Sequence, residues 1–159
     1  MSQRTWKDHV LTVWVTCAGL GYAPVASGTF GTLGGVAIAA LAGFGAPEHY
    51  LAIMLGALLI TTLGGIAAGA WAERRYGRKD PGEFVMDEVA GFLIAASWTS
   101  WPGWTHIAIA FLAFRVFDVV KPWPANRLQN LRGGAGIVLD DLMAGVYAFG
   151  VVAAWRLLF

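Results

Sequence analysis

Five carboxylates lie in or beside apolar segments, where ionisable side chains are rare and usually functional. Asp87-Glu88 and Asp140-Asp141 form two adjacent pairs, and Asp118 is the fifth. In an apolar environment such groups are unfavourable unless they are protonated, paired with cations or bound to a metal ion. Carboxylate oxygens suit Mg²⁺, whereas the three histidines are too scattered to suggest zinc. The five residues therefore predict a magnesium site.

Two cations share a helical face with one of these acids. Arg115 precedes Asp118 by three residues and Lys121 follows it by three, so a helix would place all of them on one side. A carboxylate beside two cations can hold a metal ion while the cations neutralise a phosphate. Alternatively, the acids pair with Arg115, Lys121 and Arg127 and only hold helices together.

A glycine-rich stretch begins at Ser27-Gly28-Thr29-Phe30-Gly31-Thr32, just before an apolar segment. Glycines free the backbone to present N–H groups to an anion, and the following helix N-terminus adds positive potential. Ser27, Thr29 and Thr32 are therefore candidates for binding a substrate phosphate. A flexible turn followed by close helix packing explains the same glycines equally well.

The elements that must position these residues are apolar helices. Of the 159 residues, 57% are hydrophobic and 13% charged, and the mean hydropathy is +0.60. Stretches that approach or reach membrane length occupy residues 30–45, 50–72, 84–99, 104–120 and 136–159. Residues 9–22 are too short to cross and indicate an interfacial or re-entrant segment. We expect a single-domain (1–159), all-α polytopic integral membrane helix bundle with about five crossings and an interfacial N-terminal segment.

Local signals place the carboxylates at one end of this bundle. Asp80-Pro81-Gly82-Glu83 resembles a capping box that begins a helix, which would put Asp87 about 10 Å along the helix axis. Gly133-Gly134 should open the last helix, with Asp140 at a similar depth. A proline ends the helix that carries Asp118 within about one turn. All five carboxylates are therefore expected to meet near one membrane face.

The distribution of Lys and Arg predicts the orientation. These residues cluster at 4–7, 74–79 and 121–132, whereas the connections 46–49 and 100–103 contain none. The positive-inside rule makes the clusters cytoplasmic, so the carboxylates should face the cytoplasm. A net charge of +1, without a long basic run, argues against nucleic-acid binding.

Four segments, in order, resemble the phosphatidylglycerophosphatase A family. They are Ala-Pro-Val-Ala-Ser-Gly-Thr-Phe-Gly-Thr-Leu-Gly at 23–34, Asp-Pro-Gly-Glu-Phe-Val-Met-Asp-Glu at 80–88, Phe-Arg-Val-Phe-Asp-Val-Val-Lys-Pro-Trp-Pro at 114–124, and Gly-Gly-Ala-Gly-Ile-Val-Leu-Asp-Asp-Leu-Met-Ala-Gly at 133–145. The match covers about residues 20–150. The resemblance implies a Mg²⁺-dependent enzyme of phospholipid biosynthesis in the inner membrane of a bacterium. Such an enzyme hydrolyses phosphatidylglycerophosphate to phosphatidylglycerol and inorganic phosphate.

Residue roles follow as a hypothesis. The expected catalytic and metal-binding residues are Asp87, Glu88, Asp118, Asp140 and Asp141. They would hold one or two Mg²⁺ ions that bind the terminal phosphate and activate a water for in-line attack. The expected phosphate-binding residues are Ser27, Thr29, Thr32, Arg115 and Lys121. A covalent aspartyl-phosphate remains an alternative, and the sequence leaves the oligomeric state and acyl-chain preference open.

Two other classes of protein also use such residues. Buried carboxylates line the pathways of ion and proton transporters, and a lipid-binding subunit without catalysis would use the glycine-rich stretch. In this chain the acids lie toward one face, and residues 50–72 contain no charged group that would continue a pathway. Mg²⁺-dependent release of phosphate from a lipid would separate the enzyme from both alternatives.

Overall fold

The computed structural model describes residues 5–159, which fold into helices joined by short connections. The helices are α1 (Trp6–Val15), α2 (Ser27–Gly45), α3 (Tyr50–Tyr76), α4 (Met86–Ala96), α5 (Trp104–Val120), α6 (Ala125–Leu128) and α7 (Gly134–Leu158). Each apolar stretch predicted to cross the membrane contains one helix, and α1 forms the predicted N-terminal segment. The all-α prediction is confirmed. Arg4, which belongs to the N-terminal basic cluster, lies outside the described residues, and the single-domain assignment stays a prediction.

Three helices are long and apolar enough to cross a membrane. They are α2, α7 and the continuous helical segment Pro47–Tyr76 that contains α3. Large apolar side chains on their outer surfaces are exposed, as expected where a helix faces lipid; Leu41 and Leu59 are examples. By contrast, α4 has 11 residues and is about 16 Å long, shorter than a hydrocarbon core of roughly 30 Å. The count of five crossings therefore stays a prediction.

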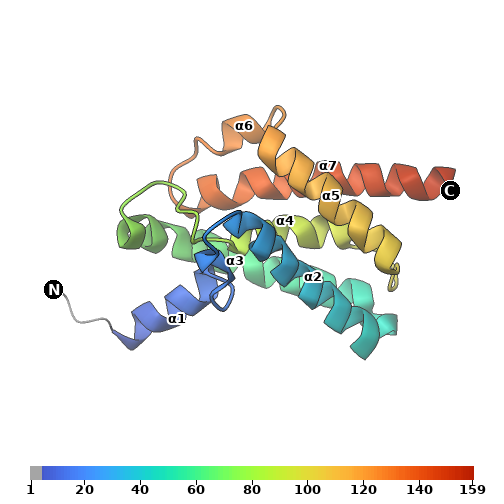
Figure 1. Cartoon of the computed structure of the whole chain (residues 1–159), viewed down its shortest axis with the longest axis horizontal. Coiled ribbons are helices and arrows are strands. Elements are labelled where there is room, and N and C mark those ends of the chain that lie inside the picture. Colours follow the sequence, from blue (N-terminus) through green and yellow to red (C-terminus); the bar gives the residue numbers. More distant parts are fainter. Residues whose placement is uncertain (1–4) are drawn as a thin grey trace.

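The short helix α4 lies at the centre of the bundle, in contact with α2, α3, α5 and α7. Helices α2, α4 and α7 run in one direction, and α3 and α5 run in the opposite direction (Figure 1). Most side chains of α4 are buried, and Val89, Phe92 and Leu93 have no exposed surface. Polar side chains at the start of α4 are therefore enclosed by protein, away from lipid.

Glycine brings α3 and α7 into backbone contact. A Cβ atom on Gly69 would lie 2.2 Å from the Cα atom of Gly134, and one on Gly134 would lie 2.2 Å from the carbonyl oxygen of Ile66. Small residues allow helices in membranes to approach this closely. The contact fixes the first turn of α7, and with it the positions of Asp140 and Asp141 farther along the same helix.

Candidate active site

The segment before α4 does not begin a helix at Asp80. Asp80 has a left-handed backbone φ of 47°, and the helix begins only at Met86. The backbone N–H of Val85 donates instead to the carbonyl oxygen of Val15 in α1, at 2.8 Å. This contact with a distant helix holds the segment out of helical geometry. The predicted capping box is therefore wrong, and so is the 10 Å depth, because Asp87 lies in the first turn of α4.

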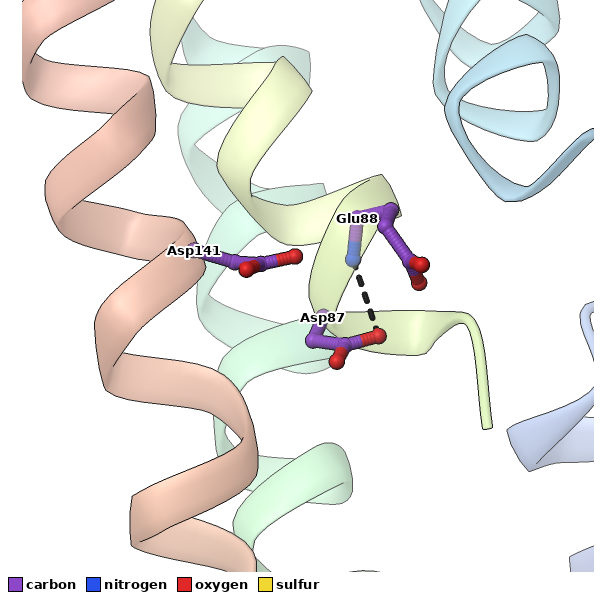
Figure 2. A group of neighbouring side chains, drawn as sticks. All are labelled: Asp87, Glu88 and Asp141. Atoms are coloured by element: carbon purple, nitrogen blue, oxygen red, sulfur yellow. Dashed lines mark hydrogen bonds between the residues drawn. The ribbon is translucent and has the colours of Figure 1, made fainter. Parts of the chain in front are cut away.

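Two adjacent carboxylates, Asp87 and Glu88, thus occupy a helix N-terminus. The backbone N–H of Glu88 donates to Oδ1 of Asp87 at 3.0 Å, as the dashed line in Figure 2 shows. The unpaired N–H groups of a first helical turn create positive potential, which stabilises negative side chains there. The helix N-terminus therefore reduces the cost of placing two carboxylates side by side at the start of α4.

A third carboxylate reaches this pair from α7. Asp141 projects from α7 toward the start of α4 (Figure 2). Asp87, Glu88 and Asp141 each offer one oxygen atom, and these atoms lie within 4.8 Å of one another. Three like charges this close in a largely buried place repel one another unless a cation lies between them. We call these three residues the carboxylate triad.

Glycine also sets the distance between α4 and α7. A Cβ atom on Gly91 would lie 2.5 Å from the carbonyl oxygen of Asp141, and one on Gly145 would lie 2.2 Å from the carbonyl oxygen of Gly91. The two backbones are therefore in direct contact one turn above the triad. This contact keeps the side chain of Asp141 within reach of Asp87.

The cations of α5 pair with the other two predicted ligands. The guanidinium of Arg115 lies 2.5 Å from Oδ2 of Asp118. The ammonium of Lys121 forms an ion pair with Asp140 and lies 3.5 Å from Oδ1 of Asp141. The structure therefore brings all five predicted acids to one end of the bundle, but it divides them. Asp118 and Asp140 are neutralised by side-chain cations.

Within residues 5–159, Asp87 and Glu88 have no Lys or Arg nitrogen within 4.0 Å. Ion pairs between helices therefore describe Asp140 and Asp141, which contact Lys121 at the end of α5. Asp118 pairs instead with Arg115 of its own helix, and Asp87 and Glu88 are not described by the ion-pair alternative. Arg127, the third cation in that alternative, also forms no ion pair in the described part of the chain.

Lys121 remains positively charged at the end of α5. Burial alone lowers the pKa of its ammonium group, but Asp141, Asp140 and Asp118 raise it by more. The net pKa lies above the ordinary value for lysine. A permanent positive charge therefore stands beside the carboxylate triad.

Two buried carboxylate oxygens have no hydrogen-bond partner among the described residues. They are Oε2 of Glu88 and Oδ1 of Asp140. A buried polar atom without a partner is costly, and most such atoms in native proteins are satisfied. A divalent cation held by the triad would satisfy the oxygen of Glu88 and offset the repulsion among the three carboxylates. Hard oxygen donors without sulfur or imidazole are the ligands that Mg²⁺ prefers, so the residues present fit this ion.

The glycine-rich stretch forms the first turns of α2 and not a loop, because α2 begins at Ser27. Gly28 faces the site. A Cβ atom there would lie 2.3 Å from Oε1 of Glu88 and 3.0 Å from Nη1 of Arg115. The hydroxyl of Thr32 donates to the carbonyl oxygen of Gly28 at 2.8 Å, so its hydrogen is used inside the helix.

The other two hydroxyl residues of this stretch are differently placed. Ser27 lines a hollow of about 270 Å³ together with Arg78 and Glu83. The backbone N–H of Thr29 donates to the carbonyl oxygen of Ala26 at 2.8 Å. Phosphate binding by Ser27, Thr29 and Thr32 stays a prediction.

Asp80 is a further acid near the site, and the sequence analysis missed it by assigning it to a helix cap. Its carboxyl lies within electrostatic range of Lys121 and Asp118 at the end of α5. Lys79, which follows α3, and Glu73, in the last turn of α3, also act on it. Although the residue is exposed as a whole, burial of its carboxyl raises its pKa, and the positive charge of Lys121 lowers it in part. The signal that could have found it is its position at the start of the 80–88 segment.

Comparisons with known proteins place the chain in a family. The family model described as phosphatidylglycerophosphatase A matches residues 13–156. A protein of Bacteroides thetaiotaomicron, provisionally named phosphatidylinositol-3-phosphatase, is 37% identical over 148 residues, which cover 87% of this chain and 88% of that protein. No solved structure was found to match the chain.

Two relatives carry the name phosphatidylglycerophosphatase A. The Escherichia coli protein is 32% identical over 146 residues, covering 91% of this chain and 80% of that protein. The Haemophilus influenzae protein is 39% identical over 79 residues, covering 49% of this chain and 48% of that protein. With the matched family model, which spans nearly the whole described chain, they lead to one conclusion: the chain is a membrane-associated phosphatase and belongs to the phosphatidylglycerophosphatase A family.

Proposed function

We propose that this phosphatase hydrolyses phosphatidylglycerophosphate to phosphatidylglycerol and inorganic phosphate and that it depends on Mg²⁺. The observation that carries the proposal is the carboxylate triad, whose oxygens lie within 4.8 Å of one another beside the cations of α5. The names of the relatives from E. coli and H. influenzae support the choice of substrate. Asp87, Glu88 and Asp141 would hold the metal ion.

The side chains around the triad suit hydrolysis of a phosphate monoester. Bound Mg²⁺ would polarise the phosphate oxygens and increase the acidity of a water molecule. Attack by water forms a new P–O bond in line with the bond to the glycerol oxygen, which breaks; that oxygen takes up a proton and leaves as a hydroxyl. Arg115 and Lys121 offset the negative charge of the transferred group. A guanidinium has five N–H donors, so the pairing of Arg115 with Asp118 leaves donors for phosphate.

Asp118 and Asp140, the two ion-paired acids, have contacts that favour a different role from that of the triad. Asp118 contacts Arg115, and Asp140 contacts Lys121, so each carboxylate holds the head of one long, flexible cation in place. Charge-assisted hydrogen bonds of this kind orient a side chain as well as neutralise it. We therefore assign Asp118 and Asp140 to the positioning of the phosphate-binding cations, and their earlier assignment as metal ligands stays a prediction.

The active site is proposed to face the cytoplasm from a bacterial inner membrane. Arg74 and Arg75 lie in the last turn of α3, and α3 ends at the same end of the bundle at which α4 and α7 begin (Figure 1). Loops and helix ends rich in Lys and Arg remain on the cytoplasmic side of bacterial membranes. The lipid tails would stay in the bilayer while the head group enters the site.

Labelling of Arg75→Cys tests this orientation, because Arg75 is exposed at that end of α3. A maleimide that cannot cross membranes should label it in inverted membrane vesicles and leave it unlabelled in intact spheroplasts. Cys17→Ser in the same protein removes the background from the native thiol. Labelling from the outer side would contradict the proposed orientation.

A comparison of lipids tests the substrate. The B. thetaiotaomicron relative, 37% identical, is provisionally named for phosphatidylinositol 3-phosphate, which is therefore the competing substrate. With Mg²⁺ present, we expect kcat/KM for phosphate release to be at least about tenfold higher with phosphatidylglycerophosphate than with phosphatidylinositol 3-phosphate, because a site built for one head group leaves polar groups unpaired with another. A higher value for the inositol lipid, or no release from phosphatidylglycerophosphate, would refute the proposed substrate.

A further inference from the structure

A second, basic cavity lies outside the carboxylate triad. Its volume is about 700 Å³, it is open to the outside, and it is lined by the end of α3, the segment after it and the turn that precedes α7. Its charged lining residues are Glu73, Arg74, Arg78, Lys79 and Arg132. With four cations and one carboxylate, the cavity carries positive potential and favours an anion.

Two of these cations have no partner within the described chain. Arg78 lies 2.6 Å from Glu83, and Lys79 donates to the carbonyl oxygen of Gln129 at 2.8 Å. Arg74 and Arg132 form no ion pair with any of residues 5–159. A guanidinium group presents a planar set of donors that matches the oxygens of a phosphate. Arg74 and Arg132 are therefore available to bind one.

The N-terminus of α7 opens at the same cavity. Gly133, which precedes the helix with a φ of 64°, lines the cavity, and no side chain caps the helix. Because α7 is 25 residues long, its first turn carries the full positive potential of a helix N-terminus. Backbone and side chains thus favour the same kind of ligand.

The cavity is close to the catalytic group. Lys79 lines it and is followed by Asp80, whose carboxyl lies within electrostatic range of Lys121 and Asp118. Along α7, Asp140 follows Gly133 by seven residues, or about 10 Å of helix. A head group with two phosphates joined by a three-carbon unit can extend over part of the distance between the cavity and the acids of α7. The flexible arginine side chains of the cavity can cover the rest.

We infer that this cavity binds the phosphodiester of the substrate while the carboxylate triad acts on the terminal monoester. The inference rests on the proposed function, because phosphatidylglycerophosphate carries both groups. It assigns Arg74 and Arg132 as determinants of specificity. Phosphatidate carries a monoester and no diester, so it cannot use the cavity and gains nothing from these two residues.

Neutral substitutions test the assignment. In Arg74→Gln and Arg132→Gln, KM for phosphatidylglycerophosphate in uncharged detergent should rise about tenfold with kcat nearly unchanged, as expected for loss of a charge-assisted contact in a partly exposed site. KM for phosphatidate should stay within about twofold. Arg75→Gln is the matched control: Arg75 lies in the same last turn of α3, so the helix dipole is affected equally, but it does not line the cavity.

Direct binding gives a readout that is independent of catalysis. Short-chain phosphatidylglycerol carries only the diester, and calorimetric titration in EDTA should give a Kd about tenfold higher in Arg74→Gln and Arg132→Gln than in the wild type or Arg75→Gln. Three results would overturn the inference. They are an unchanged Kd in the two variants, an equal rise in KM for both lipids, and a KM that depends on the amount of added anionic lipid and not on which substrate is used. Absence of phosphate release by the wild type would contradict the proposed function, and the titration would still decide what the cavity binds.

Discussion

Asp141→Asn should lower kcat for phosphate release by about 10³-fold, the effect of removing a group that stabilises transition-state charge. Asp141 belongs to the carboxylate triad, and an amide is a poorer ligand for Mg²⁺ than a carboxylate. Asp87→Asn, on the facing helix α4, should lower kcat by a similar factor. Phosphate release is measured at saturating lipid, and EDTA should reduce the wild type to the same low rate until Mg²⁺ is restored.

Thermal unfolding separates a lost metal site from a damaged fold. In the wild type, Mg²⁺ added after EDTA should raise Tm, because a ligand that binds only the folded protein stabilises it. This increase should be absent in both variants. In EDTA, Asp87→Asn should be at least as stable as the wild type, because Asp87 has two carboxylate neighbours and no cation within 4.0 Å in the described residues. Glu48→Gln, at an exposed acid, is the control. Near-normal turnover in both Asp141→Asn and Asp87→Asn would contradict the proposed metal-dependent mechanism.

The helices and the gathering of acids could be predicted because both depend on local sequence. An apolar stretch of near-membrane length forms a helix wherever it lies, since the backbone must satisfy its own hydrogen bonds. Alternating helix directions then bring the starts of α4 and α7 and the end of α5 to one end of the bundle. Asp87, Asp118 and Asp141 are close for this reason, and sequence alone was sufficient to predict it.

The start of α4 could not be predicted because a tertiary contact overrides a local signal. Asp80-Pro81-Gly82-Glu83 has the composition of a helix N-terminus, yet Val85 donates its N–H to Val15, 70 residues earlier, and the helix begins after it. No pattern within the segment indicates this partner. The result matters for function, because it puts Asp87 at the helix N-terminus and leaves Asp80 in the segment between the triad and the basic cavity.

The division of the five acids was equally inaccessible from sequence. Arg115 and Asp118 are three residues apart on one helix, so their pairing follows from helical spacing. Lys121, however, reaches from the end of α5 to Asp140 on α7, and this choice depends on how the two helices pack. The sequence predicts a cluster of five acids, whereas the packing leaves Asp87 and Glu88 with no Lys or Arg partner among residues 5–159.

Gly91→Val should lower kcat/KM by about 100-fold or more, because small displacements of catalytic groups have effects of this size. A Cβ atom at Gly91 would lie 2.5 Å from the carbonyl oxygen of Asp141 and 2.5 Å from the ring of Phe114. The ring can shift, but the carbonyl is backbone, so α7 must move away from α4. The movement would separate Asp141 from the other two carboxylates and weaken the site for Mg²⁺.

Gly91→Ala keeps this test sharp if the valine variant does not fold. Overpacking of this kind destabilises the folded protein by about 1–3 kcal/mol. Because alanine is smaller than valine, its cost should lie at the lower end of this range. Gly150→Ala on α7 is the control, because no atom lies within 4 Å of the added Cβ, and it should retain full activity. A folded Gly91→Ala protein with normal turnover and a normal rise in Tm with Mg²⁺ would show that the α4–α7 contact does not set the metal site. Loss of both in a protein that still folds would show that two glycine-lined backbones position the carboxylates, so that the site depends on residues that carry no chemistry themselves.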